Sequence, residues 1–224
     1  MFDADQLFVL WSEPAQGSRC VIGDLWREGK GGPFLFRYRS AVAGLDGFVP
    51  LPEFPNLEGV YRSAYLHGTF SQRLPSPQRP DYVSLIQGWG VQHPDDVFEV
   101  LARSGGVQMT DRIELAEFRS DEDDLVRPLE FRVAGMKHAP GSESVDPGTP
   151  LQLELEPTNP HDENATLVLT ASHAKVGYVP RQYSRLFVRL LNLGSVIDAS
   201  AVRRLTLPAD KGRLVVRAKA RASR

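Results

Sequence analysis

The sequence predicts two domains, an α+β domain followed by a small β-barrel domain with one helix. The chain has 224 residues, which exceeds the roughly 100 to 150 residues of a typical single domain. Its hydrophobic share of 42% and charged share of 24% are ordinary for a soluble globular protein. An acidic stretch near the middle separates a region of mixed strand and helix patterns from a region of short strands. We therefore expect an α+β domain over residues 1–119, an acidic linker over 120–128 and a β-rich domain over 129–224.

The strands of the first domain are predicted from runs of apolar residues. These runs are LFVLW, RCVIGDLWRE and GPFLFRYRS, and residues 29–33 (GKGGP) supply a hairpin turn between the last two. The glycines and lysine of this turn do not form a phosphate loop, because they lack the GxxxxGK[ST] spacing. Residues 46–64 and 73–82 are rich in Pro and Gly and are expected to be irregular.

Two helices are predicted after these strands. Asp81 is the expected N-cap of one helix, and the other covers residues 94–103 and ends at Gly105. Strands followed by helices are typical of an α+β domain.

The acidic stretch contains four consecutive acids, Asp121 to Asp124, followed by Pro128. Like charges repel and proline stops a helix, so we expect a solvated linker. Consecutive carboxylates seldom converge on one ion, and no metal site is predicted there. The single cysteine, Cys20, excludes an internal disulfide and is expected to be a buried strand residue.

The second domain is predicted from short alternating runs bounded by Gly, Pro, Asn or Asp. The runs are LEFRVAGM, LQLELEP, ATLVLT, KVGYV, SVIDASAVRRLTL and GRLVVRAKA, which give about six strands. Between the fourth and fifth runs, Pro180 opens one amphipathic helix that Gly194 caps.

The charges divide unevenly between the two parts. Residues 1–128 carry 12 Lys and Arg against 19 Asp and Glu, whereas residues 129–224 carry 14 against 9. The basic part is the candidate for binding phosphate, although the same charges are also compatible with a role in solubility alone.

Three blocks of the second domain resemble the HIRAN family: RVAGMKHAPG, PTNPHDENATLVL and KVGYVPRQYSRLF. The middle block carries the N-P-[YH]-D-x-N-A signature from Asn159 to Ala165. The resemblance implies an OB-like β-barrel and, from characterised members, a pocket that captures the free 3′ end of single-stranded DNA.

The resemblance also implies which residues bind nucleic acid. Lys137 would neutralise a phosphate, and His138 would stack weakly on a base. Asp162 would accept a hydrogen bond from a terminal hydroxyl, with His161 as a flat face beside it and Tyr178 as a second ring. The nucleic-acid-binding set is completed by Asn159 and Arg181.

Other interpretations of these residues remain open. Asn159, Pro160 and Asp162 are equally what a tight turn between strands requires. His161, Asp162 and His173 lack a further convergent ligand, so no metal or cofactor is predicted. The basic stretch over 203–224 is either a frayed tail or a grip on a phosphate backbone.

The first domain resembles the N-terminal subdomain of HipA-type toxin kinases. The similar segments are VIGDLWREGKGGPFLFRYRS, HGTFSQRLPSPQRPDYVSLIQGWGV and DVFEVLARSGG. No catalytic HxD motif or phosphate loop follows them, so the resemblance implies a partner of a separate kinase and no phosphoryl transfer.

We therefore expect a protein that is not an enzyme, has no catalytic residues and recognises single-stranded DNA ends. The alternative is an antitoxin-like or accessory subunit that binds a HipA-type kinase, beside a helix-turn-helix partner. No run approaches the roughly 18 to 20 apolar residues of a membrane helix, and the acidic start is unlike a secretory signal. We expect a cytoplasmic protein without a membrane partner.

Overall fold

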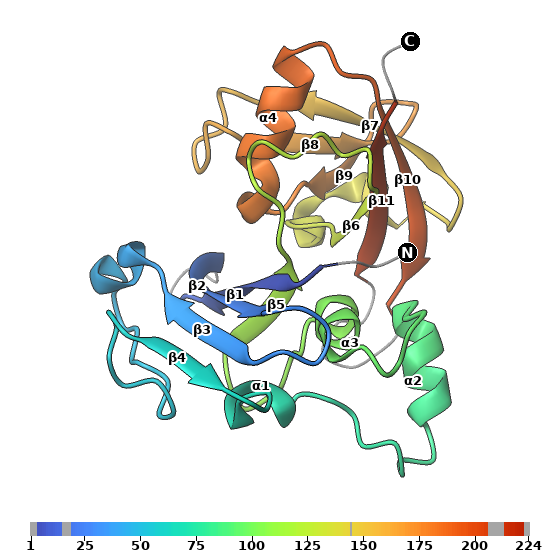
Figure 1. Ribbon diagram of the computed structural model, residues 1–224. Coiled ribbons are helices and arrows are strands. Elements are labelled where there is room, and N and C mark those ends of the chain that lie inside the picture. Colours follow the sequence, from blue (N-terminus) through green and yellow to red (C-terminus); the bar gives the residue numbers. More distant parts are fainter. Residues whose placement is uncertain (1–3, 15–18, 144, 206–212, 222–224) are drawn as a thin grey trace. The chain divides into compact units, whose positions relative to one another are not determined.

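The computed structural model describes residues 4–14, 19–143, 145–205 and 213–221. It divides into two compact units, Met1–Phe118 and Arg119–Arg224, and each is described by itself. Both units are rich in β-sheet (Figure 1).

The first unit contains a five-stranded antiparallel sheet with the order β4-β3-β2-β1-β5. Residues 29–33 join β2 to β3, as the sequence predicts for a hairpin. Its strands are β1 (Gln6–Ser12), β2 (Arg19–Arg27), β3 (Phe34–Tyr38), β4 (Val60–Ser63) and β5 (Ile113–Glu117).

In the described part of this unit, three helices and a 3-10 turn accompany the sheet. They are η1 (Ser40–Gly44), α1 (Gly68–Ser71), α2 (Tyr82–Trp89) and α3 (Val97–Ser104). An aromatic core holds them, in which the ring of Phe36 lies 4.4 Å from that of Phe54 and 5.5 Å from that of Phe70. All three rings are fully buried, so burial of apolar area is the main stabilising term of this unit.

Several predictions for this unit were wrong in detail. β4 lies in the segment that was expected to be irregular, and β5 was not predicted at all. Asp81 precedes α2 but does not cap it, because its carboxylate pairs with Arg79 at 2.8 Å. Cys20 is partly exposed rather than buried. The helices are short, and the α+β character expected for this part is not confirmed.

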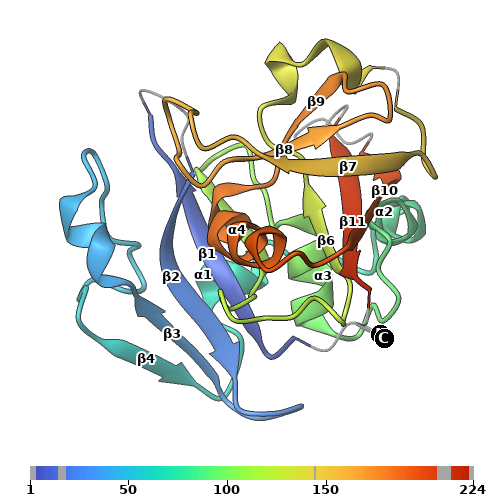
Figure 2. The same cartoon turned by 90° about the horizontal axis from the view of Figure 1, so that it is seen from above.

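The second unit contains a six-stranded sheet that curls into a half-barrel, with the order β6-β11-β10-β7-β8-β9 (Figure 2). The six strands match the predicted runs. They are β6 (Leu129–Arg132), β7 (Pro150–Leu155), β8 (Thr166–Leu169), β9 (Lys175–Tyr178), β10 (Ile197–Arg204) and β11 (Leu214–Ala220).

The two edges of this curled sheet meet at one point. Ala134, just after β6, forms an isolated bridge with Tyr178 of β9, and each backbone N–H donates to the other residue's carbonyl at 2.9 Å. Gly177 permits this approach. Its φ is +152°, and a Cβ there would lie 2.4 Å from the Ala134 oxygen. Only glycine fits this position without a shift of the backbone.

Among the described residues of this unit, one α-helix packs on the curled sheet, as the sequence predicts. The 3-10 turn η4 (Arg181–Tyr183) leads into α4 (Ser184–Asn192), and Gly194 follows its end with a φ of +74°. Leu186, Phe187 and Leu190 are buried, and the Phe187 ring lies 5.8 Å from Phe131 of β6. Two further 3-10 turns, η2 (Met136–His138) and η3 (Pro140–Ser142), follow β6.

The acidic segment expected to be a linker lies inside the second unit. Leu125 is fully buried, and the Arg189 guanidinium of α4 donates to the backbone carbonyls of Asp121 and Asp123. Asp121, Glu122 and Asp124 remain exposed. The segment is therefore anchored through its backbone while these carboxylates face water.

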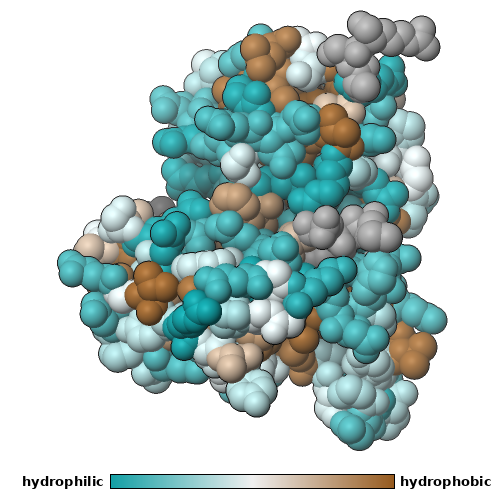
Figure 3. Space-filling model, in the orientation of Figure 1, coloured by the Kyte–Doolittle hydropathy of each residue, from teal (hydrophilic) through white to brown (hydrophobic). Residues whose placement is uncertain are grey.

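The surface in Figure 3 is mostly hydrophilic, with apolar residues in separate small patches. Within the residues described, no helix is both long enough and apolar enough to cross a membrane.

Candidate nucleic-acid interface

The signature segment after β7 forms a tight turn built by its own side chains. Asn159 Oδ1 accepts from the backbone N–H groups of His161, at 2.9 Å, and Asp162, at 3.2 Å. Asp162 Oδ1 in turn accepts from the N–H of Asn164 at 2.9 Å. The turn role predicted for Asn159 and Asp162 is thus confirmed. Each residue keeps a second polar atom that points away from the turn.

The second polar atom of Asn159 joins a network around Tyr178. Asn159 Nδ2 donates to Tyr178 Oη at 3.1 Å and to Glu156 Oε2. Tyr178 Oη donates to the same Glu156 oxygen at 2.9 Å and accepts from Lys175 Nζ at 2.6 Å. The structure therefore brings Asn159 and Tyr178 together and adds a carboxylate and an ammonium to them.

A β-bulge brings Lys175 and Tyr178 to one face of β9. Val168 pairs with Gly177, but the next residue, Leu169, pairs with Lys175, so Val176 has no partner in the ladder. In a regular strand, residues three apart point to opposite faces; one extra residue returns them to the same face. Lys175 Nζ consequently lies 4.2 Å from the centre of the Tyr178 ring.

The charges of this network favour an ionised Glu156. The hydrogen bond from Asn159 lowers the pKa of Glu156, with further lowering by Tyr178 and by the nearby Lys175 ammonium. The Tyr178 ring already has a cation over it, and Gly135 packs against its Cδ2–Cε2 side. The area of this ring that a base can cover is therefore smaller than the sequence indicates.

Asp162 of the signature turn contacts two residues at the start of the helical segment, Arg181 and Ser184. Its Oδ2 accepts from Ser184 Oγ at 3.3 Å, and Arg181 Nε lies 3.8 Å from the same oxygen. The distance to Arg181 exceeds the usual hydrogen-bond length, so the guanidinium is close but not fixed. The side chain of Asp162 is 19% exposed and that of Arg181 is 60% exposed. The Asp162 carboxylate is thus held by hydrogen bonds, whereas the Arg181 guanidinium beside it is free to change its position.

The remaining predicted residues lie on two turns, η2 and the signature turn. Lys137 is exposed in η2, which packs against β9. His138 belongs to the same turn, but its side chain lies outside the described residues. His161 is exposed at the tip of the signature turn. The structure therefore joins Asn159 to Tyr178 and Asp162 to Arg181 by side-chain contacts, and it places Lys137 and His161 at the surface.

Three residues of the candidate interface were missed from the sequence: Glu156, Lys175 and Ser184. Glu156 stands three residues before Asn159, and a turn brings residues at this spacing together. The sequence could therefore have indicated that these two side chains meet. Lys175 could not be found from strand alternation, because the bulge that turns it is a feature of the paired strands.

Among the described residues of the C-terminal basic stretch, several charges have partners within the unit. Glu130 forms ion pairs with Arg203 at 2.8 Å and with Arg217 at 2.6 Å. Arg221 forms an ion pair with Asp198 at 2.7 Å. Arg204 donates to two backbone carbonyls. Residues 206–212 and 222–224 lie outside the described part of the chain. These contacts give four described arginines of the stretch partners within the unit: Arg203, Arg204, Arg217 and Arg221.

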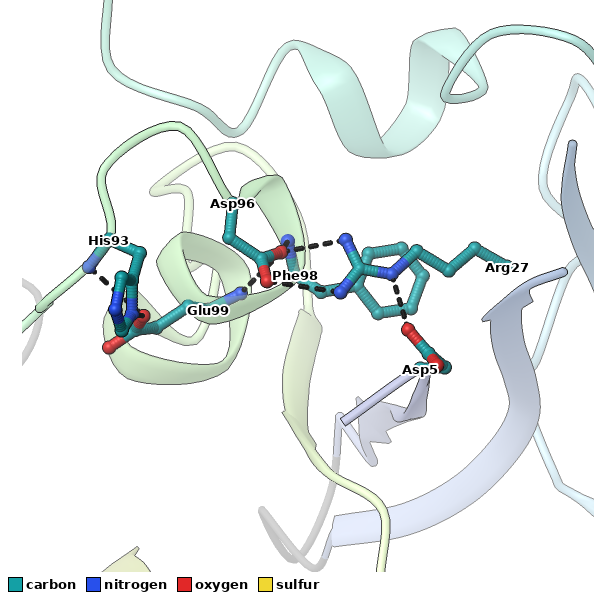
Figure 4. Close-up of polar contacts among 6 residues, drawn as sticks. All are labelled: Asp5, Arg27, His93, Asp96, Phe98 and Glu99. Carbon is teal, nitrogen blue, oxygen red and sulfur yellow. Dashed lines mark hydrogen bonds and ion pairs between the residues drawn. The ribbon is translucent and has the colours of Figure 1, made fainter. Parts of the chain in front are cut away.

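The first unit holds a second polar cluster, which is also structural (Figure 4). Asp96 caps α3 by accepting from the N–H groups of Phe98 and Glu99, and it takes a bidentate pair from Arg27 at 2.8 and 3.0 Å. Burial alone would raise the pKa of Asp96, but the hydrogen bonds and the charge of Arg27, together with the N–H groups of Phe98 and Glu99, outweigh it, and the pKa is lowered. Across the described residues, no three His, Cys, Asp or Glu side chains gather to hold a metal.

Comparison with known families gives a match within the second unit. Residues 126–217 match the family model described as the HIRAN domain. No curated protein matches the chain. The matched residues do not include the first unit, so its resemblance to HipA-type kinases stays a prediction.

Two solved structures are similar to part of the chain. The crystal structure of the HIRAN domain of human HLTF is 18% identical, covers 42% of this chain and 74% of that chain, and has a TM-score of 0.37. A crystal structure of a protein from Lactobacillus plantarum is 24% identical, covers 40% of this chain and 91% of that chain, and has a TM-score of 0.34. Both TM-scores are low, so the similarity to HIRAN domains rests on the family match.

Proposed function

We propose that the second unit binds the 3′ end of single-stranded DNA at the surface formed by Asn159, Asp162, Tyr178 and Arg181, without catalysing a reaction. The observation that carries the proposal is the Asp162–Arg181 arrangement, a fixed carboxylate 3.8 Å from an exposed guanidinium. The match of residues 126–217 to the HIRAN family supports the same ligand class.

The charges of Asp162 and Arg181 are complementary to the hydroxyl and the last phosphate at a 3′ end. A terminal hydroxyl donates a hydrogen bond to Asp162, while the phosphate of the last linkage is neutralised by Arg181. Within a continuous strand, the hydroxyl is replaced by a further phosphate, whose negative charge would stand against the carboxylate. Asp162 therefore selects a free 3′ end, because it repels the further phosphate that a continuous strand has at this position.

The other residues of the surface position and extend this contact. Asn159 holds the turn that fixes Asp162, and Lys137 offers a second exposed cation. The remaining area of the Tyr178 ring stacks on a base, which is worth roughly 1 to 3 kcal/mol per base in single-strand binding. Affinity from charge and stacking would be tolerant of sequence.

Competition between linear and circular single strands tests the proposal. A fluorescent linear strand is bound to the intact chain, and unlabelled linear and circular strands of the same sequence compete for it. The proposal predicts that the circle competes at least about tenfold more weakly, a difference of about 1.4 kcal/mol. Equal competition would contradict end recognition, although it would leave general strand binding in place.

A further inference from the structure

The helical segment that begins at the candidate site presents arginines at intervals of four residues: Arg181, Arg185 and Arg189. Leu186, Phe187 and Leu190 form the buried side of α4, whereas Arg181 and Arg185 are exposed. Four residues of an α-helix advance about 6 Å along its axis, so Arg185 and Arg189 stand about one turn apart on the same side.

The three arginines are in different states. Arg181 lies beside Asp162 at the candidate site. Within the described residues, Arg185 has no hydrogen-bond or ion-pair partner. Arg189 is occupied, because its guanidinium donates to the backbone carbonyls of Asp121 and Asp123. Only the first two are thus available to a ligand.

The bonds from Arg189 fix an acidic turn at the far end of this row. Asp121 and Glu122 are exposed in that turn, while Asp123 is paired with Arg119 at 3.0 Å. Arg189 donates to carbonyl groups, and within the described residues it forms no ion pair with Asp121 or Glu122, so two carboxylates stand against its single positive charge. The surface along α4 consequently changes from positive at Arg181 and Arg185 to negative beside Arg189.

We propose that α4 guides the DNA strand away from its captured end, with one phosphate at Arg181 and a preceding phosphate at Arg185, and that the acidic turn at Asp121 and Glu122 stops the strand from following the helix further. This proposal rests on the proposed function, since it takes the position of the strand end from Asp162. The proposal implies that the bound strand runs from Asp162 along α4 and that its bound length ends at the acidic turn. Only the last few nucleotides lie on the protein, and the rest is repelled into solvent.

Salt dependence measures the contact at Arg185. For a single strand, each neutralised phosphate contributes about 0.7 to the slope of log affinity against log salt concentration. Arg185→Ala is expected to reduce that slope by about 0.7 in anisotropy titrations of the full chain. Arg217→Ala is the matched control. It removes an equal charge from an exposed arginine on β11 that is paired with Glu130, and the slope should not change.

Strand length measures the effect of the acidic turn. A variant with Asp121→Asn and Glu122→Gln should bind a strand of about ten nucleotides several-fold more tightly, but a trinucleotide with unchanged affinity, because only the longer strand reaches the turn. An equal gain for both lengths would show a general charge effect and would overturn the stop, as would no gain for either.

The outcomes separate this proposal from the proposed function. If the wild type prefers a free end while Arg185→Ala leaves the salt slope unchanged, the path along α4 is wrong and end capture stands. If the wild type binds without preference for an end, the proposed function is wrong and the path loses its starting point. A wild type that binds no strand overturns both.

Discussion

Asn159 and Tyr178, nineteen positions apart in the sequence, are joined by a hydrogen bond of 3.1 Å from Asn159 Nδ2 to Tyr178 Oη. The bond ties the signature turn to the strand that closes the curled sheet, since Tyr178 also forms the bridge to Ala134. The residues proposed to hold the strand end are therefore fixed by the same contacts that close the fold.

Tyr178→Phe separates the hydroxyl from the ring. Loss of the hydroxyl removes its bonds to Glu156, Asn159 and Lys175, and the free energy of unfolding should fall by about 1 kcal/mol. The ring remains, so DNA affinity in anisotropy titrations should change less than about twofold. Tyr178→Ala should weaken binding by about 1 to 3 kcal/mol. Equal losses in the two variants would contradict a role for the ring.

Gly177→Ala tests the closure of the curled sheet. The added Cβ would lie 2.4 Å from both the Ala134 oxygen and Val133 Cγ1, so we expect a loss of about 2 to 4 kcal/mol and faster amide exchange in β9. Gly148→Ala is the control, because its φ is +92° but nothing lies within 4 Å of its added Cβ. It should cost only about 1 kcal/mol. Hydrogen exchange with mass spectrometry resolves the strands, and unchanged protection in β9 would refute the closure.

Asp96 variants distinguish a helix cap from an ion pair in the first unit. Asp96→Ala removes both the cap of α3 and the bidentate partner of Arg27, and should destabilise this unit by about 2 to 3 kcal/mol. Asp96→Asn keeps an oxygen for the cap and should cost less. All three tryptophans, Trp11, Trp26 and Trp89, belong to this unit, so fluorescence during urea unfolding reports on it alone. Equal costs of the two variants would leave no role for the cap, because only Asp96→Ala removes it.

The lowered pKa of Asp96 predicts how the stability of the first unit depends on pH. A carboxyl with a lowered folded pKa stabilises the fold above its ordinary value, which is 3.8 here, and that contribution is lost as the pH falls through the folded value. The urea midpoint from tryptophan fluorescence should therefore fall more steeply below about pH 4 in the wild type than in Asp96→Asn. Parallel curves would show that another group controls the acid transition.

Much of the second unit could be predicted from the sequence, because its strands alternate between a buried and an exposed side. The turn at Asn159 and Asp162 was also predictable, since these side chains bond to the backbone that follows them. Lys175 was not, because alternation places it opposite Tyr178 and only the bulge at Val176 reverses this. Local sequence describes one strand, whereas a bulge depends on two.

The first unit was harder to predict for a similar reason. Asp81 and Asp96 both precede helices, yet only Asp96 caps one, because Arg79 takes the carboxylate of Asp81. β4 lies beside prolines and glycines that indicate a loop, and its pairing with β3 decides its conformation. In both cases a tertiary or neighbouring contact overrides the local preference.

The measurement that tests the account most directly compares a strand ending in a 3′-hydroxyl with the same strand ending in a 3′-phosphate, in the wild type and in Asp162→Asn. The asparagine keeps an oxygen for the N–H of Asn164 and removes the charge, and Glu163→Gln is the control at an exposed neighbour. We predict that the wild type and Glu163→Gln prefer the hydroxyl by about tenfold or more, and that Asp162→Asn binds both strands nearly equally. A wild type that binds both strands equally, or an Asp162→Asn variant that keeps the full preference, would contradict end recognition by this carboxylate.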